Sequence, residues 1–83
     1  MQNTNIRESE LGSLIRFHRK KSGLTQIELA EMADVSKNMI HEIEKGRVSV
    51  AFDNLLKILK ILNISIEFKS SLMALFRIES EKN

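Results

Sequence analysis

Two short helix patterns separated by only about three residues constrain the fold more than any other feature of this sequence. Thr25 stands directly before the first pattern and Glu28 follows three residues later, which is the capping-box signature of a helix start. Ser36 is the cap residue of the second pattern, and Gly46 ends it. Residues 33–35 are all that remains between the two helices. The chain therefore has to fold around a tight connection between two short helices.

Apolar residues in this region follow the helical period. Leu29 and Ala30 face inward from the first of the two helices, and Ile40 and Ile43 form a buried stripe on the second. Small Ala30 suits a close helix crossing, and Val35 in the turn can fill the core below it. Two short helices with so tight a turn have the geometry of a helix-turn-helix, whose second helix lies in the DNA major groove.

The outer face of this second helix is polar, and its side chains could meet base edges: Lys37, Asn38, His41 and Glu42. A solvated helix face would show the same pattern, so periodicity alone leaves both interpretations open.

Two more helices flank this pair. The first starts near Ser9 and ends at Gly23, a natural left-handed C-cap, with a stripe at i, i+3, i+4 and i+7 of Leu11, Leu14, Ile15 and His18. The last carries apolar residues from Phe52 to Leu62, broken mainly by Lys57 and Lys60. Its apolar stripe is wider than one small core needs, which predicts a second partner, most simply a two-fold homodimer.

Strict alternation follows over residues 64–69 and predicts one half-buried strand, with Ile64, Ile66 and Phe68 on its apolar face. A lone strand cannot satisfy its own edges, so we expect it to pair with its copy in a second subunit; the alternative is that it adds to a sheet of another protein. Residues 70–83 are either a short helix docked on a partner or a tail that orders only on binding.

Composition narrows the function classes. The 83 residues suit one domain, and a net charge of +2, from 13 Lys and Arg against 11 Asp and Glu, is too mild to prove nucleic-acid binding. A basic cluster ends the first helix (Arg16, Arg19, Lys20, Lys21), although cations there also complement the helix dipole. The chain has no cysteine and only two histidines, with no metal-site spacing, phosphate loop or catalytic triad. We therefore expect no enzyme activity, no metal, no cofactor and no membrane segment, and a cytoplasmic location.

The run from Leu11 to Leu62 resembles the lambda-repressor-like (Xre/Cro) helix-turn-helix family. The resemblance rests on an ordered set of residues: Ile15, Arg19, Gly23, Leu24, Thr25, Gln26, Leu29, Ala30, Val35, Ser36, Ile40, Glu44 and Gly46. Residues 16–21 and 53–59 look like the HipB-type antitoxin branch. Members of that branch pair with a HipA-type kinase toxin, repress their own operon as dimers and dimerise through a C-terminal strand.

The resemblance implies roles for individual residues. Thr25 and Gln26 would contact DNA phosphates, as would Lys45 and Arg47 after the third helix. Base edges would be contacted by Ser36, Lys37, Asn38, His41 and Glu42, with Glu42 either accepting from cytosine or repelling phosphate. Arg19 would form a partly buried salt bridge with Glu44 beneath the recognition helix.

The sequence thus predicts an all-α fold: a four-helix lambda-repressor-like DNA-binding domain with a short C-terminal β-strand that pairs across a dimer. Its segments are a flexible N-terminus (1–8), the helix-turn-helix domain (9–63), the dimerisation strand (64–69) and a C-terminal tail or short helix (70–83). The predicted function is a repressor of an inverted-repeat operator in double-stranded DNA, as the antitoxin of a HipBA-type pair. A stand-alone phage-type or restriction-modification controller, and an interaction module that has lost DNA binding, are the alternatives.

Overall fold

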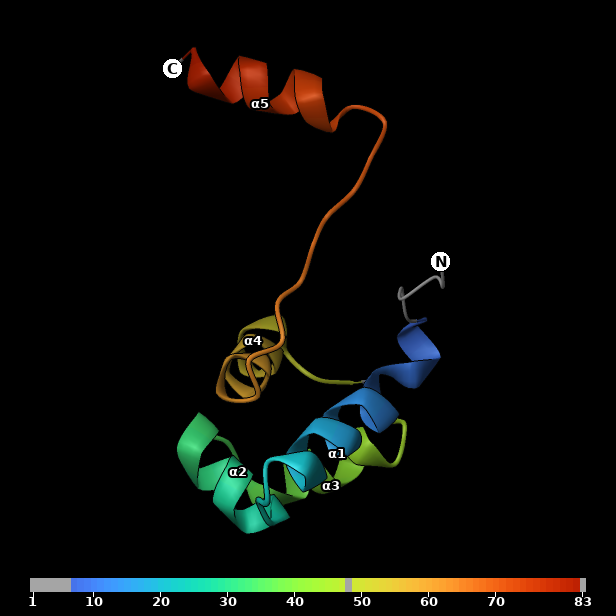
Figure 1. Ribbon diagram of the computed structural model, residues 1–83, viewed down its shortest axis with the longest axis vertical. Helices are drawn as coiled ribbons and strands as arrows, with labels where there is room; N and C mark the ends of the chain where they lie inside the picture. The colour runs from blue at the N-terminus through green and yellow to red at the C-terminus, as the bar shows by residue number, and fades with distance from the viewer. Residues whose placement is uncertain (1–6, 48, 83) are drawn as a thin grey trace.

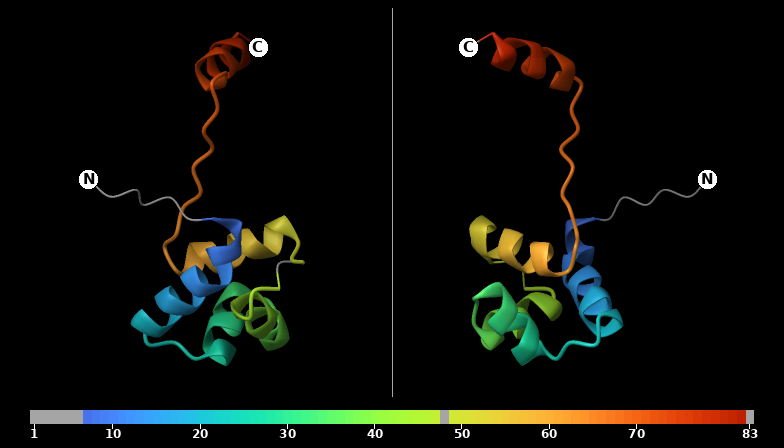
Figure 2. Two further views of the ribbon diagram at one scale, coloured as in Figure 1. Left: turned by 90° about the vertical axis from the view of Figure 1, so that its right-hand side faces the viewer. Right: turned by 60° about the vertical axis from the view of Figure 1, so that its left-hand side comes forward.

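Five α-helices and one 3-10 turn make up the computed structural model, which describes residues 7–47 and 49–82. In chain order they are η1 (Glu8–Glu10), α1 (Leu11–Lys21), α2 (Gln26–Ala33), α3 (Lys37–Glu44), α4 (Phe52–Ile61) and α5 (Met73–Glu81). The first four helices pack into one body, and α5 stands apart from it at the end of an extended segment (Figures 1 and 2).

The helix starts predicted from the cap residues are confirmed. The Thr25 hydroxyl accepts a hydrogen bond from the Glu28 amide at 3.0 Å, and the Glu28 carboxylate accepts one from the Thr25 amide at 2.8 Å. Ser36 caps α3 by accepting from the amide of Met39 at 3.1 Å. Asp34 ends α2 in the left-handed conformation, with φ 57° and ψ 50°. One left-handed residue followed by one cap residue is what lets α3 start so soon after α2.

The core lies between α1, α2, α3 and α4. Each helix contributes at least one fully buried large side chain, and these are Ile15, Leu29, Ile40, Ile43 and Ile58. Ala30 is buried in the α2 crossing and Val35 of the turn packs against the core, as expected from their size and position. Burying each large aliphatic side chain contributes about 1.5–3 kcal/mol, so this core helps to hold α3 against α1 and α2.

The close approach of α1 to α3 depends on Gly12. A Cβ atom added at this position would overlap the backbone carbonyl oxygen of Ile43 and crowd the backbone of Glu44. Glycine is therefore required here by contact with a neighbouring backbone, since its own conformation is helical. The contact brings the α1 face that carries Arg19 next to the C-terminal end of α3.

Two parts of the predicted fold are wrong for this structure. The four-helix count is wrong, because residues 73–81 form a fifth helix. The strand predicted for residues 64–69 is also absent from the described part of the chain: these residues are extended but make no β-ladder. The single chain offers that segment no second extended edge to bond with. The flexible N-terminus predicted for residues 1–8 lies outside the described residues up to position 6.

Candidate nucleic-acid interface

Helix α3 turns its polar face to solvent at the surface of the body. Lys37 and Asn38 in its first turn are exposed, while His41 and Glu42, one turn later, are half-buried. The hydroxyl oxygen of exposed Ser36 accepts a hydrogen bond from the Met39 amide, so its role in the free protein is to cap α3. The positively polarised N-terminal end of α3 therefore carries an ammonium and an amide that are free to meet a ligand.

A groove of about 390 Å³ runs between α3 and the loop that follows it. Asn38 and Glu42 line it from α3, and Arg47 and Ser49 line it from the loop. One Arg47 guanidinium nitrogen, Nη1, donates to the Glu42 carboxylate at 2.9 Å. Both groups are solvent-accessible, so this ion pair contributes little to stability. The ion pair does, however, place the Arg47 cation beside the Glu42 carboxylate on the outer face of α3.

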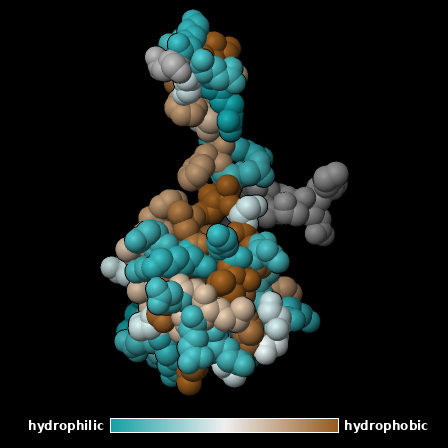
Figure 3. Space-filling view, turned by 90° about the vertical axis from the view of Figure 1, so that its left-hand side faces the viewer, coloured by the Kyte–Doolittle hydropathy of each residue, from teal (hydrophilic) through white to brown (hydrophobic). Residues whose placement is uncertain are grey.

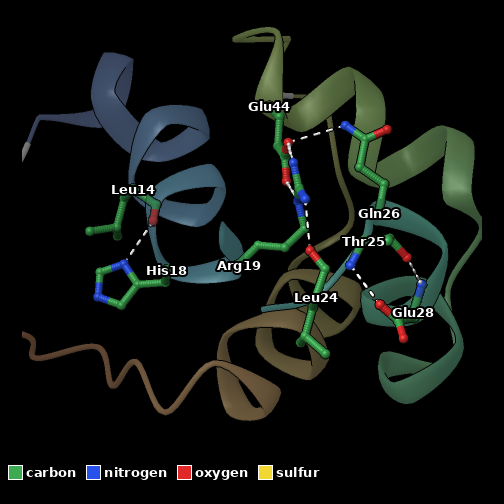
Figure 4. A network of polar contacts seen from close by, with 8 residues as sticks. All are labelled: Leu14, His18, Arg19, Leu24, Thr25, Gln26, Glu28 and Glu44. Carbon is green, nitrogen blue, oxygen red and sulfur yellow. Dashed lines mark hydrogen bonds and ion pairs between the residues drawn. The ribbon is translucent and has the colours of Figure 1, made fainter. Parts of the chain in front are cut away.

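A second ion pair lies beneath α3 and is buried (Figure 4). Arg19 on α1 donates from Nε to one oxygen of Glu44 at 2.7 Å and from Nη2 to the other at 2.9 Å. Its remaining terminal nitrogen, Nη1, donates to the Leu24 carbonyl oxygen at 2.9 Å. The side chains of Arg19 and Glu44 are only 9% and 3% exposed. A two-pronged bond of this kind fixes both the distance and the angle between α1 and α3.

The amide of Gln26 extends this network to the start of α2, where its Nε2 donates to Glu44 Oε1 at 3.1 Å (Figure 4). Burial alone would raise the pKa of Glu44, but the hydrogen bonds from Arg19 and Gln26 outweigh it and hold this pKa below its ordinary value. The hydrogen bond to Glu44 raises the pKa of Arg19, against the effect of its burial. Both groups therefore stay charged, and Gln26 is held at the surface beside the end of α3.

The basic cluster near the end of α1 divides into two parts. Arg19 turns inward to Glu44, whereas Arg16, Lys20 and Lys21 are exposed and line a hollow of about 490 Å³ with Phe17. The Lys21 ammonium lies 5.6 Å from the centre of the Phe17 ring. Lys45, which follows α3, is exposed as well. Cations therefore surround the network on the outer surface.

Several of these contacts were not foreseen from the sequence. The bond of Gln26 to Glu44 and the ion pair of Arg47 with Glu42 join residues that were assigned separate roles. The only available signal for the second was a spacing of five residues around a helix end, which is not diagnostic. His18 donates from Nδ1 to the Leu14 carbonyl oxygen at 2.8 Å, and this bond gives it a structural role. No helix in the described residues is long and apolar enough to cross a membrane.

Comparison with known proteins places this site in a family. The HTH_3 helix-turn-helix family model matches residues 15–69. An uncharacterized HTH-type transcriptional regulator of Methanothermobacter thermautotrophicus is 57% identical over 37 residues, which are 45% of this chain and 54% of that protein. The chain thus spans about half of that relative's length. The uncharacterized HTH-type transcriptional regulator y4mF of Sinorhizobium fredii is 34% identical over 59 residues, 71% of this chain and 78% of that protein.

Solved structures share the fold. The restriction-modification controller protein C.AhdI from Aeromonas hydrophila superposes with a TM-score of 0.64 at 28% identity, over 70% of this chain and 88% of that one. The clp gene regulator ClgR from Corynebacterium glutamicum gives 0.64 at 30% identity, over 80% and 85%. A chain of the HipA-HipB-O2-O3 complex gives 0.70 over 84% and 99%, but at 21% identity this likeness shows the fold alone.

Proposed function

Because the chain belongs to the HTH_3 helix-turn-helix family, we propose that it is a sequence-specific DNA-binding transcriptional repressor. The observation that carries this proposal is the exposed polar face of α3, held in place by the buried bidentate bond between Arg19 and Glu44. A helix that enters the major groove must present polar side chains at a fixed angle. Burying an ion pair has a desolvation cost, and a helix that only faces solvent would not need such a pair beneath it.

In this proposal, one set of residues contacts base edges and another contacts phosphates. Lys37 and Asn38, free at the first turn of α3, contact base edges: the ammonium donates to guanine O6 or N7, and the amide pairs with adenine N6 and N7. Ser36, His41 and Glu42 complete the base-facing surface. Phosphates are contacted by the side chains around it, which are Thr25, Gln26, Lys45 and Arg47.

The ion pair between Glu42 and Arg47 adjusts these roles. Arg47 has to leave the Glu42 carboxylate, at 2.9 Å in the free protein, or share it with a phosphate when DNA binds. Glu42 in turn is screened from the phosphate backbone as long as Arg47 stays beside it. We therefore assign Glu42 to positioning Arg47 as well as to contacting a base.

The DNA-bound form in this proposal is a homodimer. The Ile64 amide donates to the Leu59 carbonyl oxygen at 2.9 Å, whereas residues 65–69 are extended and have no β-ladder partner in the described chain. Pairing with the same segment of a second subunit would satisfy their backbone groups. A two-fold axis through that pairing sets two α3 helices about one DNA turn apart, roughly 34 Å. The operator is then an inverted repeat.

The finer role we propose is autoregulation as the antitoxin of a HipA-type kinase toxin. The resemblance of residues 16–21 and 53–59 to HipB-type antitoxins supports this choice. A restriction-modification controller with no toxin is the second candidate, and the 28% identity with C.AhdI favours it. Co-purification with the product of an adjoining reading frame, identified as kinase-like by mass spectrometry, supports the antitoxin role, and its absence at an endogenous level of expression favours the controller.

Selection of duplexes from a random pool tests the DNA-binding function itself. We expect enrichment of an inverted repeat, and we expect Asn38→Ala to weaken binding to it by about 1–3 kcal/mol and to relax preference at one or two base pairs. Arg47→Ala should weaken all sequences alike and flatten the slope of log affinity against log salt by about one unit. Failure to enrich any sequence, with a folded protein, would leave the interaction module as the function.

A further inference from the structure

In the described chain, helix α5 does not pack closely on any other helix; only the extended segment before it lines a hollow with it. Leu75 and Ile78 are each 53% exposed and Phe76 is 61% exposed. The radius of gyration is 15.4 Å, against about 12 Å for a compact domain of this length, because α5 lies beyond an extended segment (Figures 1 and 2). A helix of nine residues is marginal by itself in water. Its persistence therefore requires an apolar surface to pack on.

The body of the molecule has an uncovered apolar strip on α4. Phe52 is 56% exposed and Leu56, one turn later, is 42% exposed. Apolar surface gathers where the extended segment leaves the body (Figure 3). The match to the helix-turn-helix family ends at residue 69, so α5 lies beyond the part that DNA binding by this family accounts for. Both the helix and the strip therefore lack an assigned partner.

Antiparallel pairing of residues 64–69 determines which strip α5 can reach. In such a pair, residue 69 of one subunit lies beside residue 64 of the other, directly after the end of that subunit's α4 at Ile61. The six-residue strand meanwhile carries the chain about 20 Å away from its own α4. After the short turn at residues 71–72, α5 therefore starts next to the partner subunit's α4. The two helices also match in length, at about 14 and 15 Å.

We propose that α5 is a swapped clamp, which packs its Leu75 and Ile78 face on Leu56 of the partner subunit in a second copy of this chain. The clamp rests on the homodimer of the proposed function and adds a second contact to it. Two such contacts per dimer, together with the paired strands, supply the apolar burial that a pair of six-residue strands cannot provide alone.

The charges of the two helices agree with this arrangement. If α5 runs back along the partner subunit's α4, Glu79 lies level with Lys57 of the partner subunit and Lys82 lies level with Asp53 of the partner subunit. All four side chains are exposed in the single chain. The antiparallel direction thus pairs opposite charges twice near the C-terminal end of α5, which favours one register.

Site-specific cross-linking tests the contact directly, since the chain has no cysteine of its own. Leu56→Cys and Ile78→Cys are made in separate proteins, mixed so that subunits exchange, and treated with a short bis-maleimide, which tolerates a shift of one or two residues. We expect a covalent dimer in the mixture at a clearly higher yield than in either protein alone. A fast-migrating intrachain product in the Leu56→Cys/Ile78→Cys double variant, with none in the mixture, would mean that α5 folds back on its own α4 and would overturn the clamp. No cross-link in either sample would overturn it as well.

A matched pair of variants measures what the clamp contributes. Leu75→Asp should raise the dimer dissociation constant at least tenfold in sedimentation equilibrium, because burying a leucine contributes about 1.5–3 kcal/mol. Ser80→Asp adds the same charge on the opposite side of α5 and should change the dimer dissociation constant less than threefold. Equal constants for the two variants would refute the clamp.

Operator binding by the same proteins separates the two proposals. A mixture of the Leu56→Cys and Ile78→Cys proteins that binds the selected inverted repeat but gives no cross-linked dimer refutes the clamp alone. A cross-linked dimer that binds no DNA refutes the repressor function and leaves the clamp standing.

Discussion

At the scale of single residues, the interface depends on charges that the fold keeps out of water. Arg19 is 8% exposed, and three of its nitrogens donate to oxygens within 2.9 Å. Glu44 accepts from Arg19 on both oxygens and from Gln26 on one of them. No buried side-chain nitrogen or oxygen in the described residues lacks a partner. A network satisfied in this way is stable as a unit and fails when one member is removed.

Loss of the Arg19 guanidinium should destabilise the fold. Arg19→Met keeps the length of the side chain but leaves the Glu44 carboxylate buried without its cation, which costs about 3–5 kcal/mol of the free energy of unfolding in denaturant titration. Lys20→Met, an exposed neighbour on α1, should change it by less than about 0.5 kcal/mol. Replacing both partners, as Arg19→Met with Glu44→Leu, should recover part of the loss because no unpaired charge remains. Equal stability of Arg19→Met and wild type would mean that the pair does not hold α3.

The lowered pKa of Glu44 makes stability depend on pH. A carboxylate whose pKa is lower in the folded state than in the unfolded chain contributes stability that is fully present above its ordinary pKa of about 4.3. That contribution disappears as the pH falls through the lowered folded pKa. Denaturant titrations from pH 7 down to pH 3 should therefore show a steeper loss for wild type than for Glu44→Gln, which has no proton to bind. Parallel curves would contradict the assignment of this charge.

At the scale of elements, the orientation of α3 comes from two contacts with α1. One is the ion pair just described, and the other is the backbone contact of Gly12 with Ile43. The ion pair draws the end of α3 toward α1. The backbone contact at Gly12 is possible because glycine has no side chain to keep the two helices apart. The cap residues Thr25 and Ser36 decide where α2 and α3 begin, but these local bonds do not decide the angle between the helices.

An added methyl group at Gly12 should separate α1 from α3. Gly12→Ala places Cβ against the Ile43 carbonyl oxygen, and the resulting shift costs about 1–3 kcal/mol in spite of the better helix propensity of alanine. We expect a lower melting temperature and weaker operator binding, as measured by calorimetry and gel shift. Ser13→Ala, at the next and exposed position, is the control and should be neutral or slightly stabilising. A more stable Gly12→Ala would show that the helices can separate without cost.

At the scale of the whole molecule, the chain consists of a packed four-helix body and an arm. The arm comprises residues 64–82, in which the extended segment and α5 expose apolar side chains such as Ile66 and Phe68. Exposed apolar surface of this extent on a small protein indicates contact with another chain. In the proposed homodimer the arm would make the contacts between subunits, and the body would hold the site that meets DNA.

A charge on the apolar face of the extended segment should prevent assembly. Ile66→Asp would place carboxylates in the paired strands, and sedimentation should then show a monomer. Affinity for a full inverted repeat should fall toward that for a half-site, while half-site affinity stays the same because α3 is untouched. Ser65→Asp, on the opposite face of the segment, is the control. A dimeric Ile66→Asp with undiminished full-site affinity would rule out pairing through this segment.

What the sequence determined by itself is local. Caps such as Thr25 and Ser36, and stripes of Ile40 and Ile43, act within one or two helical turns, so their positions alone predict the first four helices and the face of α3. Recognition of the family added the expectation that Arg19 meets Glu44, which lies 25 residues away and has no local signature.

Only the tertiary structure decided what meets across the fold. It joined Gln26 to Glu44 and Arg47 to Glu42, and it showed that Gly12 is needed at a backbone contact. It also gave an extended segment in place of the expected strand and, of the two alternatives for residues 70–83, the short helix α5. The physical reason is that a helix start depends on bonds within a few residues, whereas a salt bridge or a β-ladder exists only when a distant segment, in the same chain or another, supplies the second half of the bond.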